Sequence, residues 1–344
     1  MPRCAGAFFS RTPRPLGFPK GAGPQCQGSA LMTHYINLIL VKHYEKNWGV
    51  MRLEKSFVGI KPDDLVTVTK MKHIVELQYM ERKNTKCRIK KLDKDSYLVL
   101  ETGEVKEFEH IENRKDSLNS LRQTFKKIRY LINNNFEGKP NELHCTLTYR
   151  ENMTDTKRLY ADLDKFIKRL KYKYKDKTTI DYLNVVEPQG RGAWHCHLLL
   201  RFNDLDAIFI ENEVLRDLWG HGFVTVRSLK DIDNIGAYLS AYLSDIELND
   251  TNAIHAILNE MPIKEVDGKK YIKGGRLHMY PPGMNLFRKS KGIEYPERKD
   301  MRYKNVKKIV GSAQPHYEKT YHIENEDFQN TIHYEQYNLK RTHM

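Results

Sequence analysis

The sequence lacks several features that would place it in a familiar class of protein. Five cysteines are scattered without paired spacing, at Cys4, Cys26, Cys87, Cys145 and Cys196, so neither a disulfide framework nor a zinc knuckle is expected. No apolar run approaches the roughly twenty residues that a membrane-spanning helix needs. No GxxxxGK[ST] loop is present either, which excludes a helicase motor of that kind. These absences predict a soluble, cytoplasmic protein with no membrane partner.

Acidic residues are also in short supply. The 344 residues contain 58 Lys and Arg against 44 Asp and Glu, which gives a formal net charge of +14. A protein this basic commonly binds a polyanion, and nucleic acid is the first candidate. The charge suggests a partner but no chemistry. The 20 tyrosines are compatible with stacking on single-stranded bases, although tyrosine is also an ordinary packing residue.

The composition divides the chain into four parts. Residues 1–31 contain no acidic residue, five Pro and five Gly, so we predict a disordered basic extension upstream of a natural start at Met32. Residues 32–113 contain short β-branched runs and a predicted hairpin turn at Thr102–Glu104, which indicates a small β-rich module. Residues 114–300 form the main predicted domain, and residues 301–344 are predicted to be a basic and polar tail.

Within the main domain, hydrophobic periodicity predicts an α+β fold, with an antiparallel sheet flanked by helices. A helix is expected first, over 117–134. We then expect strands over 143–149, 180–186, 194–202 and 223–226, and helices over 154–174, 211–218 and from a cap at Asp231 or Asp233 to Leu243.

Two histidines carry the sharpest local signal. His195 and His197 are two residues apart on a predicted strand, so both side chains project from the same face. Glu187 ends the preceding strand across a Gly-rich turn. If the two strands form a hairpin, Glu187 completes a metal site with two histidines and leaves coordination positions open for a substrate oxygen. The alternative is two unrelated histidines and a solvated strand-end carboxylate. His221, between two glycines, is left outside this metal shell.

A second signal lies in the helix that follows. Tyr238 and Tyr242 are four residues apart and share one helix face. Tyrosines at this spacing are more often packing residues than nucleophiles, and a phenol with a pKa of about 10 needs a metal or a base to attack at neutral pH. The nucleophile interpretation therefore depends on the candidate metal site that precedes it.

Taken together, these motifs resemble the HUH endonuclease superfamily, and more narrowly the two-tyrosine replication-associated proteins of phages and rolling-circle plasmids. The sequences HCTLTY, AWHCHLLL and YLSAYLSD correspond to its Thr-rich, metal and nucleophile motifs. One departure concerns lysine. Where many relatives have a lysine just before or shortly after the second tyrosine, this chain has Ala241 and Asp245, and Lys230 is only a speculative substitute.

The resemblance implies a rolling-circle replication initiator with an HUH-type sheet. Mg²⁺ or Mn²⁺ on Glu187, His195 and His197 would polarise the scissile phosphate of single-stranded DNA at an origin. Tyr238 or Tyr242 would attack it and leave a 5′-phosphotyrosine and a free 3′-OH for a host polymerase, with a host helicase. Residues expected to contact the DNA are Thr148, Arg191 and Lys230.

Two alternatives remain. One is a relaxase or a single-strand transposase of the same superfamily. The position of the tyrosines after the histidine motif disfavours the relaxase, because relaxases usually place the tyrosine first. The other is a non-catalytic DNA-binding regulator that keeps the fold, which a displaced metal shell would favour.

Overall fold

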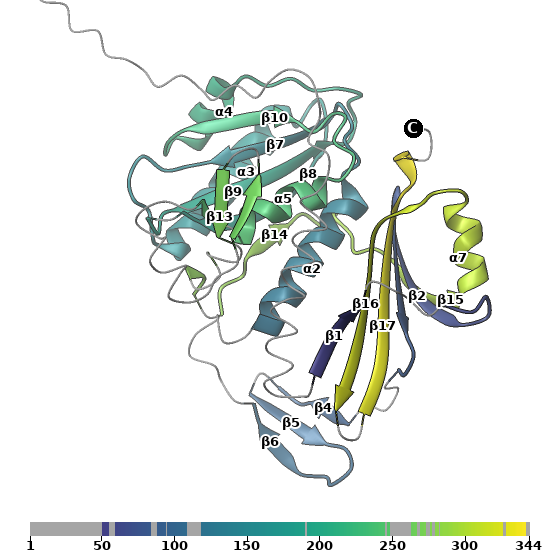
Figure 1. Ribbon diagram of the computed structural model, residues 1–344. Helices are drawn as coiled ribbons and strands as arrows, with labels where there is room; N and C mark the ends of the chain where they lie inside the picture. Colours follow the sequence, from purple (N-terminus) through teal and green to yellow (C-terminus); the bar gives the residue numbers. More distant parts are fainter. Residues whose placement is uncertain are drawn as a thin grey trace, which may run out of the picture.

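The computed structural model (Figure 1) describes most of the chain beyond residue 49. The described ranges are 50–54, 59–83, 88–93, 95–108, 118–189, 191–244, 246–247, 263–266, 269–272, 276, 279–281, 283–325 and 328–341. Predictions for residues 1–31 and for a start at Met32 lie outside these ranges. No helix in the described part of the chain is long and apolar enough to cross a membrane.

An antiparallel five-stranded sheet forms the centre of the fold. Its strands run in the order β10-β7-β9-β8-β14, with bounds β7 (Glu142–Leu147), β8 (Ile180–Pro188), β9 (Trp194–Phe202), β10 (Val224–Ser228) and β14 (Phe287–Lys289). The predicted strands of this region are confirmed to within a few residues. Strands β8 and β9 are buried along most of their length, as expected when both faces of a sheet are covered by helices.

Helices cover the two faces of the five-stranded sheet in pairs. On one face, α3 (Thr156–Tyr174) and α4 (Asn212–Trp219) pack together through Phe166 and Trp219. Helix α3 buries residues at helical spacing, Leu159, Leu163, Phe166, Ile167 and Leu170. On the other face lie α2 (Leu118–Asn135) and α5 (Ile235–Ser244), which contact each other and bring α5 against β8.

Helix α5 is capped by a different residue from those predicted. The backbone N–H of Ala237 donates to Asn234 Oδ1 at 3.0 Å, and that of Gly236 donates to Asn133 Oδ1 of α2 at 2.9 Å. The prediction of Asp231 or Asp233 as the cap is therefore wrong. Asp231 lies before the helix with a φ of 67°, and the Asp233 carboxylate instead accepts hydrogen bonds from the C-terminal segment.

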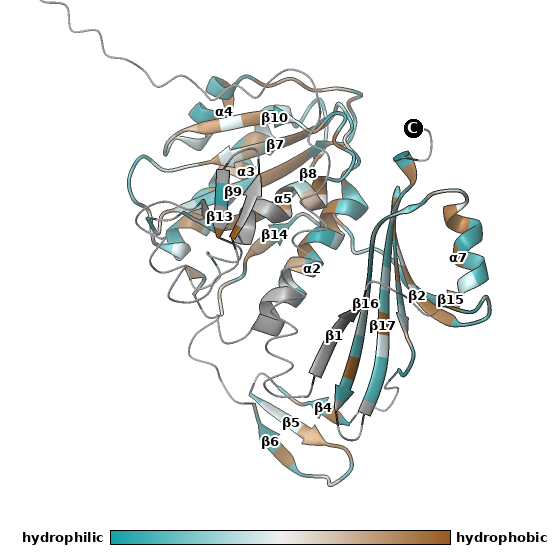
Figure 2. Ribbon diagram, in the orientation of Figure 1, coloured by the Kyte–Doolittle hydropathy of each residue, from teal (hydrophilic) through white to brown (hydrophobic). Residues whose placement is uncertain are grey.

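A six-stranded antiparallel sheet joins the two ends of the described chain. Its order is β1-β16-β17-β3-β2-β15, with bounds β1 (Val50–Glu54), β2 (Leu65–Met71), β3 (Ile74–Met80), β15 (Arg298–Arg302), β16 (Pro315–Asn325) and β17 (Phe328–Asn338). Helix α7 (Tyr303–Val310) buries Val306 and Val310 against it. Residues 301–344, assigned by composition to a tail, thus supply two of its inner strands. Composition did not show this because these strands are rich in polar residues (Figure 2).

Helix α2 lies between the two sheets (Figure 1). Arg129 Nη2 donates to Glu76 Oε2 of β3 at 2.7 Å, and the Tyr130 hydroxyl donates to the other carboxylate oxygen. Burial opposes ionisation of Glu76, but the charges of Arg129 and Lys126 and these hydrogen bonds outweigh it and lower the pKa of the carboxyl. The two sheets are therefore joined through a buried ion pair on α2.

Two small sheets complete the described structure. Strands β4 (Ile89–Lys91), β5 (Ser96–Val99) and β6 (Val105–Glu107) form one of them. The predicted hairpin is confirmed, because Gly103 has a φ of 72° and its N–H donates to Val99 O at 2.8 Å. Strands β11 (Ile246–Glu247), β12 (Ile263–Val266) and β13 (Lys269–Ile272) form the other.

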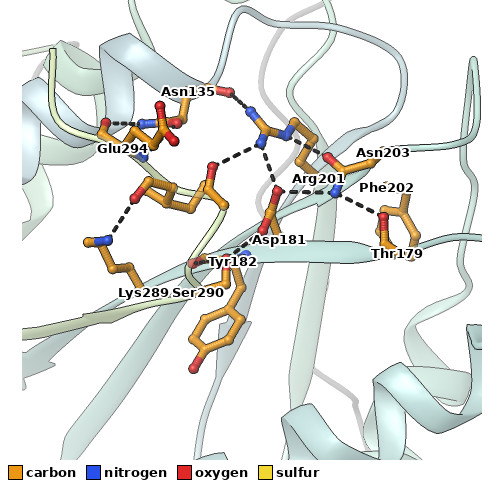
Figure 3. Close-up of polar contacts among 12 residues, drawn as sticks. Asn135, Thr179, Asp181, Tyr182, Arg201, Phe202, Asn203, Lys289, Ser290 and Glu294 are labelled. Atoms are coloured by element: carbon orange, nitrogen blue, oxygen red, sulfur yellow. Dashed lines mark hydrogen bonds and ion pairs between the residues drawn. The ribbon is translucent and has the colours of Figure 1, made fainter. Parts of the chain in front are cut away.

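A polar network fixes one end of the five-stranded sheet (Figure 3). Arg201 of β9 donates to Asp181 of β8 at 2.8 Å and to the carbonyl of Asn135, the last residue of α2, at 2.9 Å. Ser290, just after β14, donates to the same Asp181 carboxylate at 2.7 Å. This end of the sheet is thereby joined to α2 and β14. The candidate functional residues lie at the opposite end.

Candidate functional site

The register of β7, β8 and β9 places the predicted metal ligands on one face. Glu187 lies directly opposite His195, and Val185 lies opposite His197. On the other side of β9, Thr146 lies opposite His197. Because directly paired residues of an antiparallel sheet project from the same face, Glu187, His195 and His197 share it. This is the face against which α5 packs.

Two of the three predicted ligands are in direct contact. His197 Nε2 contacts Glu187 Oε2, and both side chains are buried. The other ring nitrogen of His197, Nδ1, shares a hydrogen bond with His144 Nε2 of β7 at 3.2 Å. The two imidazoles are stacked with ring centroids 5.4 Å apart. The structure therefore extends the predicted pair of histidines into a chain, Glu187–His197–His144.

Arg276 contacts the second oxygen of the Glu187 carboxylate. The guanidinium also donates to the Pro188 carbonyl at 3.1 Å, and burial lowers the pKa of Arg276. Glu187 is thus a buried carboxylate with a cation on one side and an imidazole on the other. A negative charge buried to this degree requires such partners.

The three histidines of this face are held in the neutral form. Burial lowers the pKa of His197 to about 4. Burial, with the charges of His197 and Arg191, lowers the pKa of His195 to about 4. Burial, with His197 and Arg227, lowers the pKa of His144 to about 3. Neutral imidazoles keep a lone pair on one ring nitrogen, which a metal ligand needs.

The chemistry of this donor set fits a divalent metal, but the three side chains do not converge. Among the residues that the structure describes, no three His, Cys, Asp or Glu side chains lie close enough to hold a metal ion. Glu187 and His197, which are in contact, would hold the metal together with His195, the partner of Glu187 in the sheet register. Two nitrogens and one carboxylate suit Mn²⁺ and also allow Mg²⁺.

Tyr238 lies on α5 over the same face of the sheet. Its ring meets the His144 ring edge-on, with centroids 6.3 Å apart, and the side chain is partly buried against the apolar core. Tyr242 follows one turn later on the same helix, but its side chain lies outside the described part. One predicted nucleophile is therefore placed beside the histidine chain.

The three residues predicted to contact DNA lie at different distances from this site. Arg191, in the β8–β9 turn, is exposed and close enough for its charge to act on His195. Thr148 directly follows β7, and its hydroxyl donates to the Phe223 carbonyl at 2.9 Å. Lys230 is exposed beyond the far end of β10. His221, which the prediction left out of the metal shell, lies 3.5 Å from Asp162 of α3 on the other face.

Comparison with known families gives a match over this region. Residues 142–247 match the family model of replication-associated protein ORF2/G2P. The match runs from the first residue of β7 to the end of β11. It covers under a third of the chain and includes every predicted site residue. The resemblance to replication-associated proteins is thus confirmed for these residues. Comparisons with curated proteins and with solved structures give no match.

Sequence reasoning missed two polar residues in and around the matched region. His144 belongs to the Thr-rich strand, and its alternation with Thr146 and Thr148 was the available signal, because it places all three on one face. Arg276 lies outside the matched residues, in a segment with no regular pattern. Nothing in the sequence indicates that it contacts Glu187.

Proposed function

We propose that this protein initiates rolling-circle DNA replication as an HUH-type endonuclease that cuts single-stranded DNA at an origin. The observation that carries the proposal is the position of Tyr238, edge-on to His144, which is hydrogen-bonded to His197. The support is a tyrosine of α5 that lies over a sheet face with two histidines and a carboxylate, because a phenol beside metal-binding groups suits metal-assisted attack on a phosphate. The family match over residues 142–247 and the net charge of +14 also support it.

In this proposal, Glu187, His195 and His197 hold Mg²⁺ or Mn²⁺, which when bound supplies positive charge to polarise the scissile phosphate. The phenol of Tyr238 or Tyr242 loses its proton, and its oxygen forms a bond to phosphorus as the P–O3′ bond breaks. The departing 3′ oxygen gains a proton. The 5′ end remains on the tyrosine, so the bond can be rejoined without a nucleotide cofactor.

His197 and His144 provide the orientation that this chemistry needs. If His197 Nε2 binds the metal, its Nδ1 must carry the proton and donate to His144 Nε2. This hydrogen bond fixes the tautomer and the ring plane of His197. Two tyrosines on α5 would allow one to start and the other to end a replication round. A host polymerase would extend the free 3′ end, and a host helicase would separate the strands.

The test is formation of a covalent protein–DNA adduct that survives denaturation. Origin single strands are incubated with the full chain and Mn²⁺ or Mg²⁺. We expect an adduct with the unchanged chain and none with the Tyr238→Phe/Tyr242→Phe double variant or with His195→Ala. Tyr238→Phe and Tyr242→Phe, tested one at a time, show which tyrosine forms the adduct. An adduct that persists in the double variant would show that the nucleophile has been assigned to the wrong residues.

A second function has one specific observation in its favour. Arg276 pairs with Glu187, and the described residues hold no three-ligand cluster, as expected of a DNA-binding regulator that keeps the fold without the metal. In the same assay, such a regulator would bind single strands and form no adduct with either metal. The Arg276→Ala variant would be equally inactive.

A further inference from the structure

Strand β10 presents a large apolar side chain to solvent next to the candidate site. Phe223, immediately before β10, is 76% exposed. A single exposed apolar residue is common on protein surfaces and by itself indicates nothing. Phe223 differs from such residues in its position relative to the histidines.

The sheet register gives that position. The Thr148 N–H and hydroxyl both donate to the Phe223 carbonyl, at 3.0 and 2.9 Å. Thr148 follows Leu147, the partner of Cys196 on β9, so it lies beside His195. Phe223, Thr148, His195 and Glu187 therefore form one row across four strands. At about 4.8 Å per strand, the backbone of Phe223 lies roughly 10 Å from that of His195.

Side-chain alternation places two polar residues on the same face of β10. Thr225 pairs with Thr146, which in turn pairs with His197. Arg227 pairs with His144. Both Thr225 and Arg227 are exposed. The strand thus presents an aromatic ring, a hydroxyl and a guanidinium in succession, each in a row that leads to one of the site's histidines.

The side chains of this strip are exposed, and β10 also lies at the edge of the sheet. It pairs only with β7 in the described structure. Gly222 brings the chain against β7 just before Phe223, because a Cβ at this position would overlap the Thr148 carbonyl. Beyond the other end of β10, Lys230 is exposed. The strip therefore runs from the row of Glu187 and His195 towards a second cation.

We propose that β10 is a binding track for single-stranded DNA, in which Phe223 stacks on a base beside the phosphate to be cut and Arg227 contacts the DNA backbone. An exposed aromatic ring and a cation along one strand suit a flexible polyanion with exposed bases. The net charge of +14 is complementary to this ligand. The track rests on the proposed function, because that function determines why a single strand would be present.

The control residue is Phe209, which is 84% exposed. It lies at the opposite end of the sheet, where the N–H of its neighbour Ile208 donates to the Pro140 carbonyl at 3.1 Å. A phenylalanine of equal or greater exposure is thus available far from the histidines. Because both side chains are exposed, neither substitution removes core contacts, and equal thermal midpoints would verify that both variants fold.

The experiment measures binding of a fluorescent single strand of about 16 nucleotides by anisotropy, with EDTA present so that no cutting occurs. We expect Phe223→Ala to weaken binding about 5- to 150-fold and Phe223→Trp to preserve it, because the loss is that of one stacked base. Phe209→Ala should bind like the unchanged chain. Arg227→Ala should reduce the dependence of binding on salt by about one phosphate contact.

Equal weakening by Phe223→Ala and Phe209→Ala would overturn the track, as would normal binding by Phe223→Ala. Competition by duplex DNA as strong as that by single strands would also overturn it. The adduct assay reads out the proposed function separately. An adduct with normal binding by Phe223→Ala refutes the track alone. Loss of binding by Phe223→Ala without any adduct from the unchanged chain refutes only the nuclease.

Discussion

The two large sheets differ in what their buried polar groups contact. In the six-stranded sheet and its contact with α2, buried carboxylates are held by side chains of that sheet and of the helices α2 and α7. Glu76 is held by Arg129 and Tyr130, and Glu335 by Tyr337 and by the Tyr303 hydroxyl at 3.1 Å. In the five-stranded sheet, the buried polar groups Glu187, His197 and His144 form a chain beneath α5.

The difference shows that a buried ionisable residue does not by itself mark a functional site. The pKa of Glu76 is lowered because nearby cations outweigh the effect of burial, so this carboxylate has a structural role. The pKa values of His195 and His197 are lowered chiefly by burial, which leaves neutral rings that can bind a cation. Burial also lowers the pKa of His316 in the six-stranded sheet, so a shift becomes informative only together with the groups that surround it.

The largest effect on this comparison is expected from Arg129→Met. Within the described residues, the substitution leaves the buried Glu76 carboxylate with Lys126, 3.8 Å away, as its remaining cationic partner. Removing one partner of a buried ion pair costs about 3 kcal/mol or more of the free energy of unfolding. Urea denaturation would measure the loss.

Adding Glu76→Gln to Arg129→Met removes the unpaired charge and should recover much of this stability. An Arg129→Met variant as stable as the unchanged chain would mean that the ion pair does not hold the two sheets together. Binding of single strands by the folded fraction should be unchanged in either variant.

His144→Phe should give an intermediate effect, on metal binding rather than on stability. It removes the hydrogen bond to His197 Nδ1 but keeps a planar ring. Loss of such an orienting partner typically weakens metal binding 10- to 100-fold, about 1.4 to 2.8 kcal/mol. Calorimetric titration with Mn²⁺ would measure it.

His316→Phe is the matched control in the other sheet. His316 also has a pKa of about 4, mainly because of burial, and it bonds to Gln336 at 2.9 Å. It lies on β16, so Mn²⁺ binding should be unchanged. Equal weakening of Mn²⁺ binding by both variants would indicate a general loss of structure and would refute the positioning role of His144.

The smallest effect on stability is expected at Asn234, which caps α5, and at Asp231, which precedes the helix without capping it. Asn234→Ala removes the cap of α5 and should cost about 1 kcal/mol, measured by thermal unfolding. It should also reduce adduct formation, because Tyr238 lies in the first turn. Asp231→Gly should cost no stability, because Asp231 does not cap the helix and its φ of 67° suits glycine. A larger loss of stability from Asp231→Gly than from Asn234→Ala would indicate that Asp231 caps α5 after all.

The sequence predicted four strands of the five-stranded sheet and its helices because their patterns are local, but it did not predict β14. The apolar residues of α3 recur at helical spacing, and His195 and His197 share a face whatever strands lie beside them. The contact between His144 and His197 depends on how β7 pairs with β9, which no local pattern specifies. The six-stranded sheet was missed because it pairs strands from distant parts of the chain, as Met80 with Ile332. Its strands also bury polar residues that bond to one another, so they show no apolar pattern.

That pairing has a consequence during synthesis. A ribosome adds about 5 to 20 residues per second, so β3 emerges roughly 10 to 50 seconds before β17, its partner in the sheet. The region that includes the candidate site lies between β3 and β17 in the sequence. It can therefore fold before β17 is available to pair with β3. During that interval the edge of β3 is unpaired. A chaperone bound there would prevent it from pairing with nascent chains on adjacent ribosomes of the same mRNA.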